Sequence, residues 1–334
     1  MKGFFNMSEQ VLKDMNPAGY MMPWKEKKTE NVYLGELFEI LSLKKAEKVK
    51  GCADVLRFKA DPETGEIKLA QVWFCKNRLC PICNWRRRRV NSFQTGKTLA
   101  AAIKQYPKAR FIFVTLTCRN VEYRDLRRTI QDESKAFGKL INRKRFDGVV
   151  LGYLRSTEIT VKEHDPNFNG NHSYHVHVHA LIMVKPSYFK GGKYLSTREW
   201  VQYWRKAMKL DYDPICNVKR VRPNKKKGRD SLKASAKEVA KYQMKDSDVL
   251  KHNRERDKVV VYELNKALVS THQFSYGGVL KKIHHDLFTD QDVDDLLEKM
   301  AADLDADSAK DPAEEEARII TYYWDNHRQN YFKQ

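Results

Sequence analysis

Apolar residues change their spacing along residues 109–250 in a way that predicts alternating strands and helices. Apolar runs rich in β-branched and aromatic residues predict strands, whereas apolar residues three or four positions apart predict helices. The order βαββαβ, followed by one more helix, suits a ferredoxin-like antiparallel sheet, an α+β fold whose first and third strands are central. The expected elements are strand 110–117, helix 123–145, strands 149–161 and 174–184, helix 197–210, strand 215–222 and helix 232–250.

Three further parts of the chain lie outside this pattern. Residues 32–48 have helical spacing, and residues 52–74 read as a β-hairpin that leads into a basic helix. The acidic C-terminal region is expected to be helical, with an apolar face formed by Ile319, Ile320, Tyr323 and Trp324. The four expected domains are the irregular or helical segment 1–50, the hairpin and basic helix 51–108, the sheet domain 109–285 and the acidic helical region 286–334.

The strand expected at 174–184 carries three histidines at alternate positions. Successive side chains of a strand point to opposite faces, so His175, His177 and His179 share one face and apolar residues occupy the other. Neutral imidazole is a common ligand of divalent metals, and this spacing brings two rings onto one ion. The alternative is a half-exposed strand that is merely rich in histidine.

A carboxylate is expected beside these histidines. The strands before and after residues 164–171 would form a hairpin, because this loop contains proline, asparagine and glycine. If the turn lies near the middle of the loop, Glu158 falls opposite His177 or His179, and paired residues point to the same face. His175 ranks behind them as a ligand, because it is less able to reach the same ion.

Four cysteines form a second candidate metal site. Cys75, Cys80 and Cys83 are spaced C-x4-C-x2-C, and Cys52 at the opposite end of the hairpin can supply a fourth thiolate. Four thiolates suit a closed, structural zinc site, and clustered cysteines in a cytoplasmic protein favour metal binding over disulfides. The alternative is a set of small buried thiols.

The net charge of +20 indicates a polyanionic partner, and DNA or RNA is favoured. Residues 286–318 hold thirteen acids and three bases, so the positive charge lies elsewhere. Dense basic runs can also be solvated surfaces or nuclear addresses, but two runs beside a histidine strand favour phosphate contacts. The candidate DNA-binding residues are Arg86, Arg87, Arg88, Arg89, Lys219, Arg220, Arg222, Lys225, Lys226, Lys227 and Arg229.

Neither a membrane span nor a secretory signal is expected. No run of eighteen or more apolar residues occurs, and the first 27 residues lack an apolar segment followed by a small-residue cleavage site. These patterns predict a cytoplasmic protein that does not bind a membrane.

The helix expected at 232–250 carries a candidate nucleophile. At 3.6 residues per turn, Glu238, Lys241, Tyr242 and Lys245 lie within a sector of about 100°. The two lysines could favour the tyrosinate or bind the phosphate that it attacks. The alternative is an amphipathic helix with a charged outer face, in which Glu238 and Tyr242 form a passive pair four residues apart.

Three motifs resemble those of rolling-circle replication initiators of small bacterial plasmids, members of the HUH endonucleases. They are Phe113-Val-Thr-Leu-Thr117, His175-Val-His-Val-His179 followed by Ala-Leu-Ile, and Glu238-Val-Ala-Lys-Tyr242, in matching order and spacing. The knuckle Cys75-x4-Cys-Pro-x-Cys83 is similar to that of one plasmid subfamily. The resemblance covers residues 50–280, and it departs at His175, where related motifs often have another residue.

The resemblance implies metal-dependent cleavage of one DNA strand. His177 and His179 would bind magnesium or manganese, with Glu158 as the acidic third ligand. Tyr242 would be the nucleophile that stays linked to the 5′ end and frees a 3′ hydroxyl. Glu238 would act as general base in a second, terminating cut. The zinc would be structural.

The implied partners follow from that activity. They are origin DNA with a single-stranded or hairpin nick site, a host helicase, a single-strand-binding protein and a DNA polymerase, and self-association into a homodimer is a further option. Competing assignments are an HUH transposase or conjugative relaxase, a non-enzymatic zinc-dependent DNA-binding protein, and a metal-dependent nuclease without covalent chemistry.

Overall fold

The computed structural model describes residues 10–16, 19–62, 65–169, 171–221, 223–224, 229–240, 244–288 and 318–333. These residues fall into two compact units, one from the parts Met1–Arg87 and Gln291–Gln334 and the other from Arg88–Asp290. Each unit is considered by itself. Several predicted residues lie outside the described ranges, namely Arg222, Lys225, Lys226, Lys227, Lys241, Tyr242 and most of the acidic segment.

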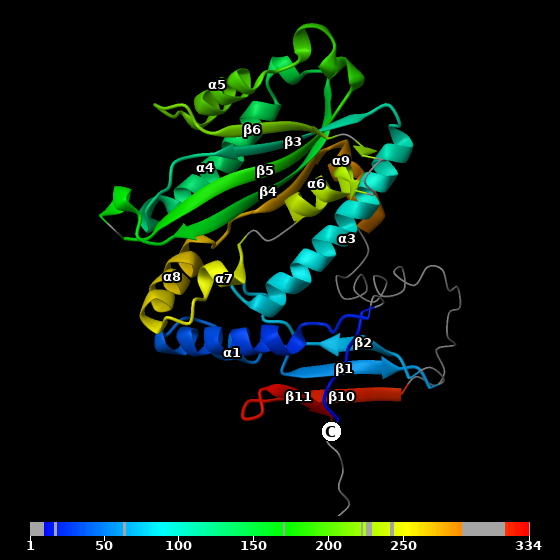
Figure 1. Ribbon diagram of the computed structural model, residues 1–334, viewed down its shortest axis with the longest axis vertical. Coiled ribbons are helices and arrows are strands. Elements are labelled where there is room, and N and C mark those ends of the chain that lie inside the picture. The colour runs from blue at the N-terminus through cyan, green and yellow to red at the C-terminus, as the bar shows by residue number, and fades with distance from the viewer. Residues whose placement is uncertain are drawn as a thin grey trace, which may run out of the picture. The chain divides into compact units, whose positions relative to one another are not determined.

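The second unit is built on a five-stranded antiparallel sheet (Figure 1). Its strands lie in the order β6-β3-β5-β4-β9. The first four strands in sequence thus have the spatial order 4-1-3-2 of a ferredoxin-like sheet, with β3 and β5 central, which confirms the predicted α+β fold. The strands are β3 (Arg110–Thr117), β4 (Val150–Lys162), β5 (Ser173–Val184), β6 (Cys216–Val221) and β9 (Phe274–Gly278).

Helices cover both faces of this sheet. On one face α4 (Tyr123–Ile141) and α5 (Thr197–Met208) bury the apolar side of β5 in a core that includes Val178, Phe137 and Trp200. On the other face Leu181 and Met183 of β5 pack with residues of α3 (Pro81–Gln105), α6 (Ser231–Ala240) and α9 (Val279–Phe288). Since side chains alternate along β5, this second face is the one that carries the three histidines.

The helix expected at 232–250 is interrupted. The described elements there are α6 and α7 (Asp246–Val249). Helix α8 (Arg254–Ala267) follows them, and β7 (Pro223–Asn224) pairs with β8 (Arg229–Asp230) just before α6. Among the described residues, no helix is both long and apolar enough to cross a membrane.

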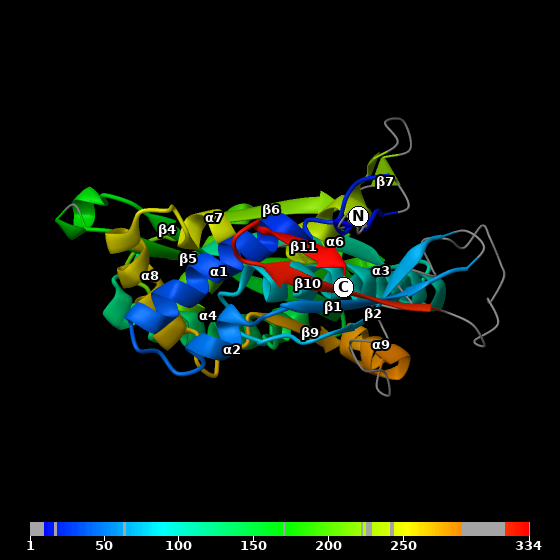
Figure 2. The ribbon, with the colours of Figure 1, turned by 90° about the horizontal axis from the view of Figure 1, so that it is seen from below.

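The first unit contains a four-stranded antiparallel sheet in the order β11-β10-β1-β2, seen from below in Figure 2. The hairpin of β1 (Val55–Ala60) and β2 (Ile67–Val72) was predicted, and β10 (Arg318–Asp325) and β11 (Asn330–Lys333) complete the sheet. The unit also contains α1 (Trp24–Ile40) and α2 (Ala46–Lys50), whereas a single helix was expected at 32–48.

The prediction of a helical C-terminal region is wrong for residues 318–333. Leu56, Phe58 and Ala60 of β1 face Tyr322, Ile320 and Arg318 of β10 in antiparallel register. The run Arg318-Ile-Ile-Thr-Tyr-Tyr-Trp-Asp325 is rich in β-branched and aromatic residues, which fit a pleated surface. Pairing with β1 satisfies its backbone groups and buries Tyr322 against Phe58, with ring centroids 5.8 Å apart.

Candidate functional site

Glu158, His177 and His179 converge on one face of the sheet in the second unit. The register of β4 and β5 pairs Glu158 with His177, which confirms the pairing expected from the hairpin loop. Oε2 of Glu158 lies 3.2 Å from Nε2 of His177 and 3.0 Å from Nε2 of His179. The side chains are mostly buried, with exposed fractions of 17%, 13% and 12% in the same order.

This donor set fits a divalent cation. One potential ligand atom from each of the three residues lies within 4.8 Å of the other two. A carboxylate oxygen is a ligand that magnesium and manganese prefer, whereas imidazole nitrogens suit transition metals such as iron, nickel, copper and zinc, so this mixed set can accept several divalent ions. The buried Nδ1 of His177 has no hydrogen-bond partner among the described residues, so neither ring nitrogen of that histidine is committed to the protein backbone.

Electrostatics keep Glu158 ionised. Burial by itself would raise the pKa of this carboxyl group, but hydrogen bonds from His177 and His179 outweigh burial and hold the pKa below its ordinary value. At neutral pH the cluster therefore contains a carboxylate that can accept from two imidazoles or bind a cation.

Strand β3 orients His179. Thr115 pairs with His179 in the sheet, and its Oγ1 lies 3.1 Å from Nδ1 of the ring. The Phe113 ring lies on the same side, with its centroid 5.8 Å from that of His179 and an interplanar angle of 26°. A hydrogen bond to Nδ1 leaves Nε2 to face Glu158 and any bound ion. The alternation in the Phe113–Thr117 motif assigns Phe113 and Thr115 to one face of the strand, and the pairing of β3 with β5 places that face beside His179.

His175 lies outside the group of three. Its Nδ1 is 2.9 Å from Oδ1 of Asn120, whose Nδ2 donates to Oδ2 of Asp165 and to Oγ of Ser173, each at 2.9 Å. Burial lowers the pKa of His175, which favours the neutral ring. This network fixes the Nδ1 side of the His175 ring against Asn120. The role of His175 as a metal ligand stays a prediction.

A bulge after β3 brings Asn120 to this face. Thr117 pairs with His177 and Val121 pairs with Tyr174. The three residues 118–120 therefore lie opposite the two residues 175–176. The extra residue shifts the alternation of side chains by one position. Asn120 therefore points to the histidine face, which no spacing in the sequence had indicated.

Helix α6 packs over the face that carries the cluster (Figure 1). Ala236 and Val239 of α6 share a core with Leu181, which follows His179 by two positions on the same side of β5. Glu238 lies in α6 and is half-buried, and Lys245 is exposed beyond the end of that helix. The roles of Glu238, Lys241, Tyr242 and Lys245 stay predictions.

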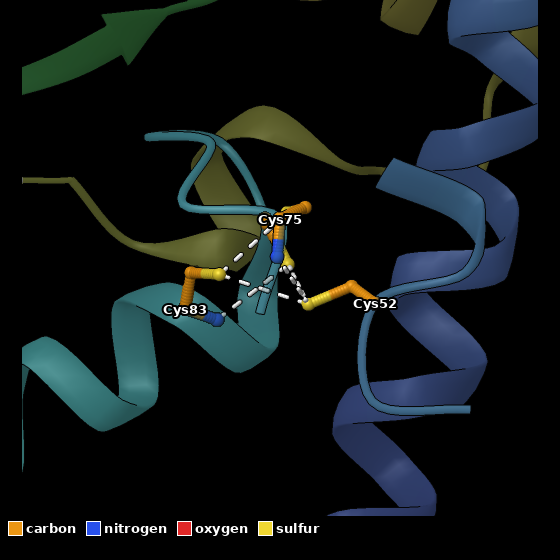
Figure 3. A group of neighbouring side chains, drawn as sticks. Cys52, Cys75 and Cys83 are labelled. Atoms are coloured by element: carbon orange, nitrogen blue, oxygen red, sulfur yellow. Dashed lines mark hydrogen bonds between the residues drawn. The ribbon is translucent and has the colours of Figure 1, made fainter. Parts of the chain in front are cut away.

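The four cysteines of the first unit form a buried cluster that could hold a zinc ion. Sγ of Cys83 lies 3.7 Å from Sγ of Cys52 and 3.6 Å from Sγ of Cys75, and Sγ of Cys80 lies 3.6 Å from Sγ of Cys52. Figure 3 shows the sulfurs of Cys52, Cys75 and Cys83 directed toward one another. A tetrahedron with zinc–sulfur bonds of about 2.3 Å has edges of about 3.8 Å, so the spacing fits zinc and excludes disulfides.

Hydrogen-bond donors and a buried cation surround the sulfurs. The backbone nitrogen of Cys83 donates to Sγ of Cys80 at 3.5 Å, and Nδ2 of Asn31 donates to the same sulfur at 3.3 Å. Lys28 is fully buried, donates to the carbonyl of Cys52 at 2.9 Å and forms an ion pair with Asp54, so a carboxylate already balances its charge. Burial raises the pKa of Cys80. Thiolates in this site therefore need a compensating cation. No motif or spacing in the sequence indicates that Asn31 and Lys28 lie beside the cysteines.

The basic residues have different environments. Arg87 donates to Oδ1 of Asn84 at 2.7 Å and to the carbonyl of Asn77 at 2.9 Å, so it braces the cysteine knuckle. Lys219 and Arg220 are exposed on the edge strand β6. The side chain of Arg229 is not among those described. DNA contacts by the arginine and lysine runs stay predictions.

Comparisons with known proteins agree with the motifs. A family model described as "Replication protein" (Rep_1) matches residues 66–332. The chain is 44% identical over 327 residues to a "Protein rep" of Lentilactobacillus hilgardii, which covers 98% of this chain and 99% of that one. It is 34% identical over 328 residues to a "Protein rep" of Streptococcus pneumoniae, covering 97% and 96%. No solved structure matches. Family and relatives support the resemblance to plasmid replication initiators, and the chain belongs to the Rep_1 family of replication proteins.

Proposed function

We propose that the protein is a plasmid rolling-circle replication initiator that binds the double-strand origin and nicks one DNA strand. The observation that carries the proposal is the convergence of Glu158, His177 and His179 on the sheet face over which α6 packs. Membership of the replication protein family supports DNA as the substrate.

Glu158, His177 and His179 would hold the divalent cation, which when bound would polarise the scissile phosphate and offset its growing negative charge. Thr115 keeps the His179 ring oriented toward Glu158, and the low exposure of all three side chains limits competing water. The chain thus pre-organises the site before DNA enters.

Tyr242 would supply the nucleophile. Its phenol oxygen attacks phosphorus, the bond between phosphorus and the 3′ oxygen breaks, and the phenol proton ends on that oxygen. The products are a 5′-phosphotyrosine and a free 3′ hydroxyl that primes synthesis, and the covalent link conserves the bond for later rejoining. Lys241 and Lys245 would favour the tyrosinate or bind the phosphate.

Replacing Tyr242 with phenylalanine should abolish covalent attachment to DNA, because phenylalanine has no oxygen to form the ester. The measurement incubates protein with a 3′-labelled single-stranded origin oligonucleotide and manganese, then examines the labelled adduct and any free labelled fragment on a denaturing gel. Tyr262→Phe is the matched control, since Tyr262 is 40% exposed on α8. An adduct that persists in Tyr242→Phe would refute the nucleophile, and cleavage without any adduct in the wild type would favour a nuclease without covalent chemistry.

Glu238 would activate water for the terminating cut, so that the enzyme is released after one round of replication. In Glu238→Ala the first nick should survive within about a few-fold of the wild-type rate, whereas hydrolysis at the regenerated origin should fall by about a hundredfold or more. The two steps are followed separately, with one oligonucleotide for nicking and a tyrosine-linked strand carrying a second site for termination. Equal loss of both steps would contradict this division of labour.

Two competing assignments use parts of the same chain. An HUH transposase or relaxase would share the nicking site, and a non-enzymatic zinc-dependent DNA-binding protein would need only the cysteine cluster and the basic residues. Failure of the wild-type protein to cleave any origin DNA, with DNA binding intact, would favour the binding protein. Cleavage followed by strand transfer between two separate DNA ends, without priming of replication, would favour the transposase or relaxase.

A further inference from the structure

One face of the four-stranded sheet in the first unit is open with respect to the residues that the structure describes. Its other face is the core side, where Leu56, Phe58 and Tyr331 are buried at 0% exposure and Tyr322 at 6%. On the open face, by contrast, Trp73 is 50%, Ile319 51% and Tyr323 38% exposed. The open face is defined by Val55, Arg57 and Lys59 of β1, Lys68 and Gln71 of β2, Trp73 just after β2, Ile319, Thr321 and Tyr323 of β10, and Phe332 of β11.

Aromatic rings form a row across this face. Phe332 pairs with Tyr323, and Tyr323 pairs with Val55. Leu56 pairs with Val72, so continuation of that register brings Trp73 beside Val55. The Arg57 guanidinium lies over the Trp73 ring at 5.2 Å from its centroid, which places that ring on the open face. Trp73, Tyr323 and Phe332 therefore line one row across the sheet, with Val55 between Trp73 and Tyr323.

Cationic and polar residues form the neighbouring rows. Arg57 pairs with Thr321 on one side and Gln71 on the other, and its Nη1 donates to Oε1 of Gln71 at 2.8 Å. The next row holds Lys59 between Ile319 and Lys68. Beyond the aromatic row, Arg328 lies over the Phe332 ring at 3.7 Å and pairs with Asp325. The open face therefore combines flat apolar rings with positive charge.

We propose that this open face binds single-stranded DNA, with bases stacked on Trp73, Tyr323 and Phe332 and phosphates near Arg57 and Lys59. Base stacking on aromatic rings beside a basic track is the usual way in which proteins hold single strands without reading sequence. A protein partner fits less well, because the centres of protein interfaces are depleted of lysine, and Lys59 and Lys68 would lose their hydration there. The proposal rests on the proposed function only in taking DNA as the partner.

The binding test uses the full chain and does not depend on nicking. Fluorescence anisotropy with a labelled 20-nucleotide oligo-dT, in the presence of zinc and without magnesium or manganese, should show an affinity loss of about tenfold for Trp73→Ala and more for Trp73→Ala with Tyr323→Ala. Tyr20→Ala is the matched control, since Tyr20 is 71% exposed in the same unit and lies outside the row. Zinc content and circular dichroism check that each variant is folded.

Two further measurements separate the possible outcomes. Lys59→Gln should reduce the slope of log affinity against log salt by about 0.7, the value for one phosphate contact on a single strand. Wild-type affinity in the folded double variant would overturn the proposal. Sedimentation of the same variants shows whether the open face instead joins two copies of the chain. Loss of a dimer with unchanged DNA affinity would also overturn the proposal of DNA binding. If the Trp73 and Tyr323 variants lose affinity for oligo-dT but nick saturating origin DNA at the wild-type rate, the result supports DNA binding by the open face. That result does not depend on the proposed role of Tyr242.

Discussion

Alanine at position 179 should abolish DNA nicking while the protein still folds and binds DNA. His179 contributes Nε2 to the group with Glu158 and His177, and among the described residues this group has no fourth His, Cys, Asp or Glu. Loss of one of three ligands removes the cation, and with it several kcal/mol of transition-state stabilisation, so we expect the single-turnover rate to fall by about a thousandfold or more.

The comparison with His175→Ala makes this prediction specific. His175 carries the same side chain on the same strand face but hydrogen-bonds to Asn120 and lies outside the group of three. We expect its substitution to slow nicking far less and to leave manganese binding, measured by calorimetry, within a few-fold of the wild type. Near-wild-type nicking by His179→Ala, or an equal loss of manganese binding in the two variants, would contradict the assigned ligand set.

Serine at position 80 should remove the zinc and unfold the first unit. Cys80 is fully buried and its sulfur lies 3.6 Å from that of Cys52, with Asn31 donating to it at 3.3 Å. Structural zinc contributes on the order of 10 kcal/mol of apparent binding free energy, which is comparable to the whole stability of a small domain. We expect zinc content to fall from one ion per chain to near zero and the thermal unfolding midpoint of this unit to be lost.

Cys216→Ser is the control for that experiment. Cys216 is also buried, and burial raises the pKa of its thiol to about 12, but it lies in the core of the second unit and not in the cysteine cluster. Its substitution should cost some stability and leave the zinc in place. A Cys80→Ser protein that retains one tightly bound zinc and a cooperative unfolding transition would show that the cluster is merely a set of buried thiols.

Local patterns predicted much of the second unit. Apolar runs rich in β-branched and aromatic residues predicted all four strands of the ferredoxin-like order, and the loop between two of them predicted that Glu158 lies opposite His177 or His179, of which the structure pairs it with His177. These predictions succeeded because a hairpin loop sets the register of its own strands and because strand periodicity assigns each side chain to a face. The spacing of the cysteines similarly predicted their cluster.

Contacts between distant segments could not be predicted in this way. Residues 319–324 could present an apolar face as a helix or as a strand, and only the free edge of β1, about 260 residues earlier, decided for a strand. The same holds for Thr115 beside His179 and for Asn31 beside Cys80, where no local spacing links the partners.

The sequence by itself therefore determined the family, the order of the strands and the chemistry of two candidate metal sites, because residue type and short-range spacing carry that information. Only the tertiary structure decided that the last two strands complete the sheet of the first unit and so form its row of aromatic rings. The physical reason is that backbone pairing and burial are satisfied by whichever segments meet in the folded chain, regardless of their separation in sequence.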